Sequence, residues 1–206
     1  MFRLIFKSFS GTISMITRNV KESDASQLAT LLEQMGSKFK MSLKDMQDRI
    51  AAFYSKGHQI IVAELEGSIR GVIAFGCYEQ FRIPGSCCHI DTLVIDKNYR
   101  GKGIGKKLIE VAEKYATEHG ALIIELITSN HRKSSGTHAF YESLGYKDHI
   151  ALDYSYFAKE RSNQKVSFFA KTIPPSSTFN SESISNANNA DEEKAPRGNH
   201  RPKSRL

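Results

Sequence analysis

The chain has 206 residues, of which 40% are hydrophobic and 25% charged, and its formal net charge is +7. This length suits one domain with a full core and leaves no room for two ordinary domains once the tails are subtracted. The positive charge suits a polyanionic cofactor, but it is common among soluble proteins and nucleic-acid binders and therefore excludes little.

The three cysteines, Cys77, Cys87 and Cys88, are too few for a secreted disulfide framework and favour a reduced, intracellular compartment. The sequence has no metal-binding pattern of paired cysteines and histidines, and no apolar stretch approaches the roughly 20 residues that a membrane span needs. We therefore expect a soluble, cytoplasmic protein without a metal and without a membrane partner.

Residues 1–12 are rich in aromatic and basic side chains, and no acidic residue occurs before Glu22. This composition resembles a transit peptide, which leaves organellar targeting open. Alternatively, the functional domain starts near Met15, because residues 15–20 have the pattern of a first strand. We place residues 1–12 outside the domain as an N-terminal extension and the domain itself at residues 13–171.

Two amphipathic helices are expected next. Residues 22–24 can cap a helix over residues 25–35, and Gly36 follows its end. Ser42 is a capping residue for a second helix, which continues to about Tyr54. Both segments carry apolar side chains at the spacing of one helical face, so both helices should pack against a core.

Three strands follow the helices. Residues 58–65, 69–79 and 87–95 predict strands, with a hairpin signal at 66–68 and a turn forced by the Pro-Gly pair at 84–85. The first half of the chain should therefore form an antiparallel meander.

A glycine-spaced loop comes directly after the third of these strands. Gly101, Gly103 and Gly105 remove side chains that would keep a ligand from the backbone amides. The helix expected over residues 104–119 directs its unpaired N–H donors and the positive end of its dipole at the loop. This arrangement predicts a phosphate-binding site.

The spacing of this loop matches neither a P-loop nor a Rossmann turn. Arg100, Gly103 and Gly105 instead satisfy Arg/Gln-x-x-Gly-x-Gly/Ala. The loop thereby resembles the acyl-coenzyme A pyrophosphate loop of the GCN5-related N-acetyltransferases.

The sequence after the loop strengthens this resemblance. Residues 121–128 are a β-branched apolar run, and residues 138–146 resemble the closing Phe/Leu-Tyr-x-x-x-Gly-Phe/Tyr segment of the family, so the match covers about residues 15–171. The resemblance implies a single α/β (α+β) domain with a mixed, mostly antiparallel sheet flanked by helices. Its fourth and fifth strands, at 87–95 and 121–128, should be central, parallel and splayed.

The rest of the chain completes the expected domain. A fourth helix begins at Ser134 or Ser135, and residues 150–160 and 165–171 predict a final pair of strands. Residues 172–206 consist mainly of proline, serine, asparagine and charged residues, which cannot offset their own ordering entropy. We expect a disordered polar tail there.

The resemblance also implies that acetyl-coenzyme A (acetyl-CoA) is the co-substrate and that its pantetheine arm pairs with the fourth strand like an added strand. Ser134 stands where the family commonly has an asparagine, and it can replace that residue as a hydroxyl donor. The predicted cofactor-binding residues are Leu93, Val94, Ile95, Arg100, Gly101, Lys102, Gly103, Ile104, Gly105, Lys106 and Ser134.

The family implies direct attack of an amine on the thioester in a ternary complex. Tyr141 lies in the closing segment, where many members carry the tyrosine that faces the coenzyme sulfur, so it is the predicted general acid. The alternative is that Phe140 and Tyr141 are ordinary core residues of a helix.

His89 is the predicted general base, with Asp91 beside it. The two residues are two apart on one strand and therefore share a face, with Leu93 continuing that face toward the thioester. A nearby carboxylate would raise the basicity of the histidine. Glu125 on the fifth strand is a rival base, and an ordered water relay is a further alternative.

The main functional alternative is a catalytically silent acyl-CoA sensor or interaction domain. Such a protein would keep the loop and could dispense with Tyr141 and any base. A nucleic-acid partner is not expected, because the basic clusters at 132–133 and 197–205 are short and lack an aromatic stacking platform. We expect a monomer or homodimer whose partners are acetyl-CoA and an amine.

Overall fold

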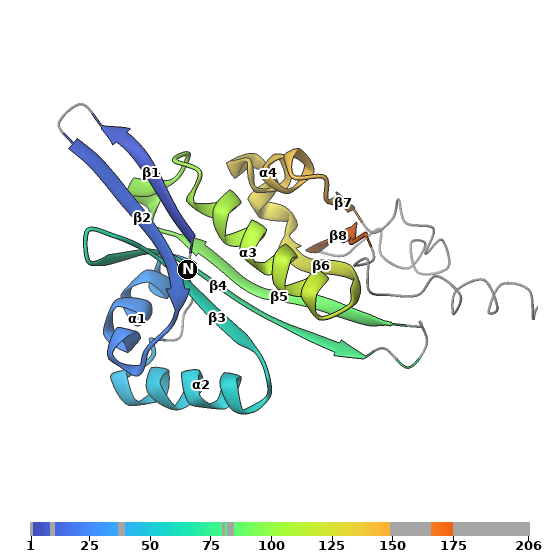
Figure 1. Cartoon of the computed structure of the whole chain (residues 1–206), viewed down its shortest axis with the longest axis horizontal. Helices are drawn as coiled ribbons and strands as arrows, with labels where there is room; N and C mark the ends of the chain where they lie inside the picture. Colours follow the sequence, from blue (N-terminus) through green and yellow to red (C-terminus); the bar gives the residue numbers. More distant parts are fainter. Residues whose placement is uncertain are drawn as a thin grey trace, which may run out of the picture. The chain divides into compact units, whose positions relative to one another are not determined.

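The computed structural model describes residues 2–8, 11–36, 40–79, 81, 85–148 and 166–174, all within the compact unit Met1–Pro175. These residues form an eight-stranded sheet in the order β1-β2-β3-β4-β5-β6-β8-β7 (Figure 1). The strands are β1 (Phe2–Ser8), β2 (Gly11–Asn19), β3 (Gln59–Leu65), β4 (Ser68–Glu79), β5 (Ser86–Ile95), β6 (Ala121–Ser129), β7 (Lys147–Asp148) and β8 (Val166–Thr172). The helices are α1 (Ala25–Glu33), α2 (Leu43–Ser55), α3 (Ile104–Glu118) and α4 (Thr137–Ser143), with short 3-10 turns η1 (Glu22–Asp24), η2 (Lys97–Tyr99) and η3 (Asn130–Ser135).

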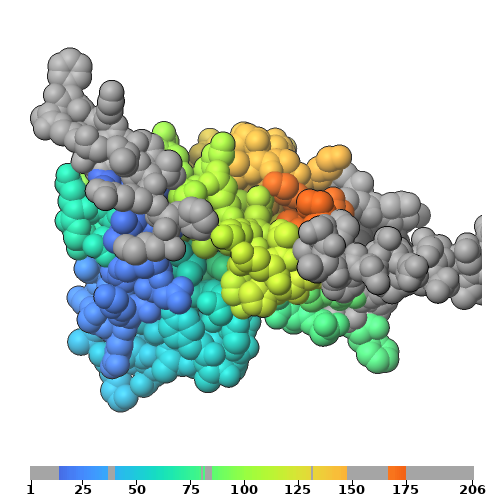
Figure 2. Space-filling model, viewed as in Figure 1, coloured from blue at the N-terminus to red at the C-terminus, as the bar shows by residue number. Residues whose placement is uncertain are grey.

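Helices cover both faces of the sheet. Side chains alternate along the strands, so Val62 of β3 packs in the core under α1 and α2, whereas its neighbour Ala63 packs in the core under α3. The core on the α3 side also receives Tyr141 of α4 and Phe169 of β8. On the face shown in Figure 2, the surface of α3 adjoins that of α4 and β8.

Local capping explains where the second helix begins. The Ser42 hydroxyl accepts a hydrogen bond from the amide of Asp45 at 3.1 Å, and the Asp45 carboxylate accepts one from the amide of Ser42 at 3.1 Å. This reciprocal capping box satisfies two otherwise unpaired amides, as the serine in the sequence predicted.

No helix among the described residues is long and apolar enough to cross a membrane.

The central strands β5 and β6 are parallel, which confirms the fold predicted from the sequence. Their pairing runs from Ser86 opposite Ala121 to Ile90 opposite Leu126. Beyond this point β5 continues to Ile95 without β6 as a partner, so no strand among the described residues pairs with that edge. The predicted splay between these two strands is therefore present.

A β-bulge interrupts the pairing of β4 with β5 just before the splay. Ala74 pairs with Thr92 and Phe75 pairs with Ile90, so Asp91 is an extra residue in β5. A bulge of this kind shifts by one residue the alternation of side chains between the two faces.

The bulge corrects one prediction about the site. His89 and Asp91 were expected to share a face with Leu93, but Leu93 packs against the core on the α3 side, together with Ile90. Val94 enters the core under α1 and α2 instead. The strict alternation assumed from the sequence fails because Asp91 occupies the bulge.

The sheet includes residues on both sides of the expected domain bounds, 13 and 171. β1 pairs along its whole length with β2, so residues 2–8 form an edge strand of the sheet. β8 extends to Thr172, and the buried Ile173 donates its amide to the carbonyl of Leu122 at 2.8 Å. The strand predicted at residues 150–160 lies outside the described residues.

Candidate active site

The predicted phosphate loop lies between β5 and α3. Gly101 and Gly103 have φ angles of 73° and 79°, in the left-handed region that side chains disfavour. A Cβ at Gly101 would meet no atom within 4 Å, so that side of the loop is open. At Gly105, in contrast, a Cβ would lie 3.2 Å from the Phe140 ring, so this glycine allows α3 to pack closely against α4.

The first turn of α3 offers backbone donors at the loop. Its first intrahelical hydrogen bond joins the amide of Lys107 to the carbonyl of Gly103 at 3.0 Å. The amides of Ile104, Gly105 and Lys106 precede that bond and have no intrahelical acceptor. Together with the helix dipole, they form the kind of site that binds phosphate.

Basic side chains gather beside this loop around one aromatic ring. The Lys102 ammonium lies 4.6 Å from the centre of the Tyr99 ring, and the Arg70 guanidinium lies 4.4 Å from the same centre. Arg100 donates from Nε to the carbonyl of Ile95 at 3.2 Å. Sequence reasoning missed Arg70, which reaches the loop from β4 and whose guanidinium pairs with the Asp96 carboxylate at 3.1 Å.

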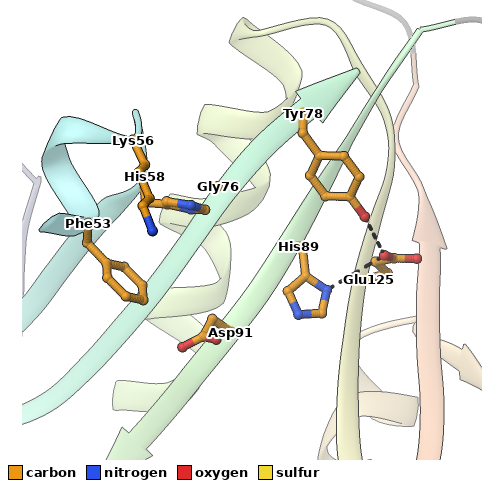
Figure 3. A pocket seen from close by; sticks show the side chains of 8 residues that line it. All are labelled: Phe53, Lys56, His58, Gly76, Tyr78, His89, Asp91 and Glu125. Carbon is orange, nitrogen blue, oxygen red and sulfur yellow. Dashed lines mark hydrogen bonds and ion pairs between the residues drawn. The ribbon is translucent and has the colours of Figure 1, made fainter. Parts of the chain in front are cut away.

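A cavity of about 450 Å³ opens on the face of the sheet that carries α2 (Figure 3). It brings together His89 and Asp91 with the rival base Glu125. Its lining residues are Phe53, Lys56, His58, Gly76, Tyr78, His89, Asp91 and Glu125.

Cross-strand register explains why distant residues meet in this cavity. Gly76 of β4 is the partner of His89 on β5, and His89 is the partner of Glu125 on β6. Gln59 of β3 pairs with Phe75, which places the preceding residue, His58, beside Gly76. His58, Gly76, His89 and Glu125 therefore form a row across four strands, which no local motif could have revealed.

Glu125 contacts two neighbours through one carboxylate oxygen. The Tyr78 hydroxyl donates to Oε1 at 2.9 Å, and His89 Nδ1 lies 3.6 Å from the same oxygen, within ion-pair reach but too far for a good hydrogen bond. Partial burial and the bond to Glu125 raise the pKa of Tyr78, so its hydroxyl stays a donor. The other ring nitrogen of His89 points away from Glu125 (Figure 3).

Tyr141 lies apart from this cavity. Its side chain is 7% exposed in the core on the α3 side, with ring centres 5.1 Å from Phe140, 5.9 Å from Tyr146 and 5.8 Å from Phe169. Burial raises the pKa of Tyr141 to about 12. No residue in the described part of the chain hydrogen-bonds its hydroxyl. The predicted acid and base are thus on opposite faces of the sheet.

The other predicted residues lie near the splay and the loop. The backbone of Leu93, Val94 and Ile95 runs along the unpaired edge of β5. Ser134 is exposed in η3, while the side chain of Asn130 accepts a hydrogen bond from Ser167 of β8. In the described ranges, no group of three or more histidine, cysteine or acidic side chains is arranged to hold a metal ion.

Several known proteins share this sequence pattern and fold. The model of the acetyltransferase (GNAT) family matches residues 28–146, which is more than half of the chain. An uncharacterized N-acetyltransferase from Chlorobaculum tepidum is 27% identical over 146 residues, covering 69% of this chain and 80% of that protein. Glucosamine-6-phosphate N-acetyltransferase from Arabidopsis thaliana is 27% identical with a TM-score of 0.57, covering 65% of this chain and 92% of that one.

The fold is also shared with a Salmonella typhimurium protein that was solved with its cofactor acetyl-CoA. The identity is 14% and the TM-score 0.59, over 81% of this chain and 98% of that one.

Proposed function

Because the chain belongs to the acetyltransferase (GNAT) family and its relatives include N-acetyltransferases, we propose that it transfers an acetyl group from acetyl-CoA to a primary amine. The acceptor is a small molecule or a protein, and its amine attacks the thioester directly in a ternary complex. The observation that carries this proposal is the end of the pairing between β5 and β6 at Ile90, because it leaves residues 93–95 of β5 without β6 as a partner between the phosphate loop and His89.

Acetyl-CoA fits the donors that the chain offers. The open loop at Gly101 and Gly103 and the free amides at the start of α3 suit its pyrophosphate. Lys102 adds positive charge beside the loop, whereas the charge of Arg70 is paired with the Asp96 carboxylate. The unpaired edge of β5 at residues 93–95 suits a pantetheine arm that pairs like a strand.

His89 is the proposed general base. A primary amine is mostly protonated near neutral pH and must lose one proton before its lone pair can attack. The ring nitrogen of His89 that points away from Glu125 accepts this proton, while the Glu125 carboxylate, 3.6 Å from Nδ1, stabilises the imidazolium that forms. Glu125 is therefore a positioning residue, and Tyr78 in turn fixes the carboxylate.

Tyr141 is proposed to assist departure of the coenzyme thiolate. A hydroxyl with a pKa of about 12 is a weaker acid than a thiol, whose pKa is ordinarily about 8.5, so full proton transfer to sulfur would be uphill. We therefore assign Tyr141 a hydrogen bond to the sulfur as negative charge develops there. The second proton of the attacking amine is then the one that ends on the thiol.

The test is a screen of the purified protein with acetyl-CoA and a panel of amines and peptides, reading the release of free thiol. We expect release that depends on the acceptor and falls about a hundredfold or more when His89 is replaced by glutamine, since general base catalysis contributes that much. A protein that is stabilised by acetyl-CoA but releases no thiol with any amine would instead support the silent sensor.

A further inference from the structure

We propose that the cavity around Gly76 selects small amines that carry an anionic group, a carboxylate or a phosphate, a few bonds from the amino group. This inference rests on the proposed acetyltransferase function and adds the class of acceptor. The charged and aromatic groups along the row from β3 to β6 support it.

The His58 ring occupies a fixed position at one end of the cavity. A Cβ at Gly76 would collide with this ring, so the ring lies directly over the glycine backbone. Phe53 of α2 packs against the same ring, with ring centres 5.2 Å apart and the ring planes tilted by 44°. The backbone of His58 is fixed as well, because its amide donates to the carbonyl of Phe53 at 3.0 Å. An imidazole fixed in this way can present an N–H donor to an anion in either protonation state.

The basic and the acidic side chains that line the cavity come from different elements of the fold. Lys56 and His58 come from the turn between α2 and β3, whereas Asp91 and Glu125 come from β5 and β6 (Figure 3). Glu125 is engaged by Tyr78 and His89. Asp91, which accepts a hydrogen bond from the Thr92 hydroxyl at 2.8 Å, is the carboxylate placed to attract an ammonium group.

The span between the two ends limits the size of the acceptor. His58 directly precedes β3 and His89 belongs to β5, with β4 between them, so their backbones are about 10 Å apart. The cavity volume of about 450 Å³ falls in the range of small-molecule sites. Gly76 forms the floor and Phe53 a wall, which suits a short carbon skeleton with its amine at His89 and Asp91 and its anion at Lys56 and His58.

The experiment compares matched acceptors that differ only in the anion. One pair is an amino acid and its carboxamide, and the other is an amino alcohol phosphate and the free amino alcohol. We expect kcat/KM to be at least about tenfold higher for the anionic member of one or both pairs, because charge-assisted hydrogen bonds contribute that much. The pair with the larger ratio identifies whether the anion is a carboxylate or a phosphate.

Two variants test whether Lys56 and His58 cause the preference for anionic acceptors. Lys56→Gln and His58→Asn should each lower the ratio of kcat/KM between the anionic and the uncharged acceptor severalfold. Lys44→Gln is the control, because Lys44 lies on α2, the helix that precedes both residues, but pairs with Asp48 at 3.1 Å and does not line the cavity. The ratio should be unchanged in that variant.

Two results would overturn the inference. The first is an equal kcat/KM for the anionic acceptors and their uncharged counterparts, which would leave the acetyltransferase function intact. An anion preference that survives in both the Lys56 and the His58 variants would place the anion elsewhere. Absence of thiol release with every amine would be a different failure, that of the proposed function itself.

Discussion

Glu125 Oε1 lies 3.6 Å from His89 Nδ1 and also accepts the Tyr78 hydroxyl at 2.9 Å, so one oxygen connects strands β4, β5 and β6. Neither His89 nor Glu125 would be fixed without the parallel register that makes them direct partners. In our proposal, Glu125, which the sequence suggested as a rival base, thus acts through His89.

This relationship predicts that Glu125→Gln lowers kcat about tenfold or more, because a neutral amide stabilises the imidazolium less well than a carboxylate does. Steady-state kinetics of Glu125→Gln, His89→Gln and the double variant test the coupling. If the two residues act as a unit, the double variant should be no slower than His89→Gln alone. Fully additive losses would separate Glu125 from His89. Glu118→Gln, in an exposed pair on α3, serves as the control.

The phosphate loop gives a second prediction. Gly103→Val should abolish the rise in melting temperature that acetyl-CoA produces, because a branched side chain at a φ of 79° distorts the loop and covers the amides at the start of α3. Gly67→Val is a matched control with a φ of 74° in the turn between β3 and β4, where a Cβ would meet no atom within 4 Å. Both variants lose stability through backbone strain, but only the Gly103 variant should lose the response to acetyl-CoA. An unchanged response in a folded Gly103 variant would place the pyrophosphate elsewhere.

Tyr141→Phe should lower kcat about 10- to 100-fold, the amount expected when one hydrogen bond to a developing charge is deleted. The melting temperature should hardly change, since the ring remains and no described residue loses a hydrogen-bond partner. Measuring kcat together with the melting temperature distinguishes the two roles. A stability loss with wild-type kcat would make Tyr141 a core residue only.

Burial of Tyr141 also predicts a dependence of stability on alkaline pH. The pKa of Tyr141 is about 12 in the folded protein and about 10 in the unfolded chain, so between these values the folded state holds one proton more. The free energy of unfolding should therefore fall by up to about 1.4 kcal/mol per pH unit from this group as pH rises from about 10 to 12. Urea denaturation across that range should show a shallower decline for Tyr141→Phe. An identical slope would show that the tyrosine is not shielded from solvent.

The end of the domain can be tested by two deletions. Removing residues 176–206 should leave kcat and the melting temperature unchanged, because this segment lacks the apolar residues to build a core. Removing residues 172–206 should destabilise the protein by about 2 kcal/mol, because the side chain of Ile173 is 6% exposed in the core. A large loss of activity in a folded protein that lacks only residues 176–206 would assign the tail a role at the site.

The sequence by itself determined the local elements that flank the site. Apolar periodicity predicted α3, the serine at position 42 predicted the start of α2, and the spacing of Gly101 and Gly103 predicted a loop that presents backbone amides. These features follow from interactions within a few residues, so the chain order contains the necessary information. The parallel pair β5 and β6 followed from the strand, helix, strand succession.

Only the tertiary structure decided which side chains meet. The bulge at Asp91 reverses the faces of β5, so Leu93 points away from the side that His89 occupies. Register from β3 to β6 brings Glu125 to the same cavity as His58, the residue before β3, although 66 residues lie between them in the sequence. Side-chain direction in a sheet depends on pairing with distant strands, and a shift of one residue moves a side chain to the opposite face. No local pattern specifies that pairing, so the composition of this cavity had to come from the fold.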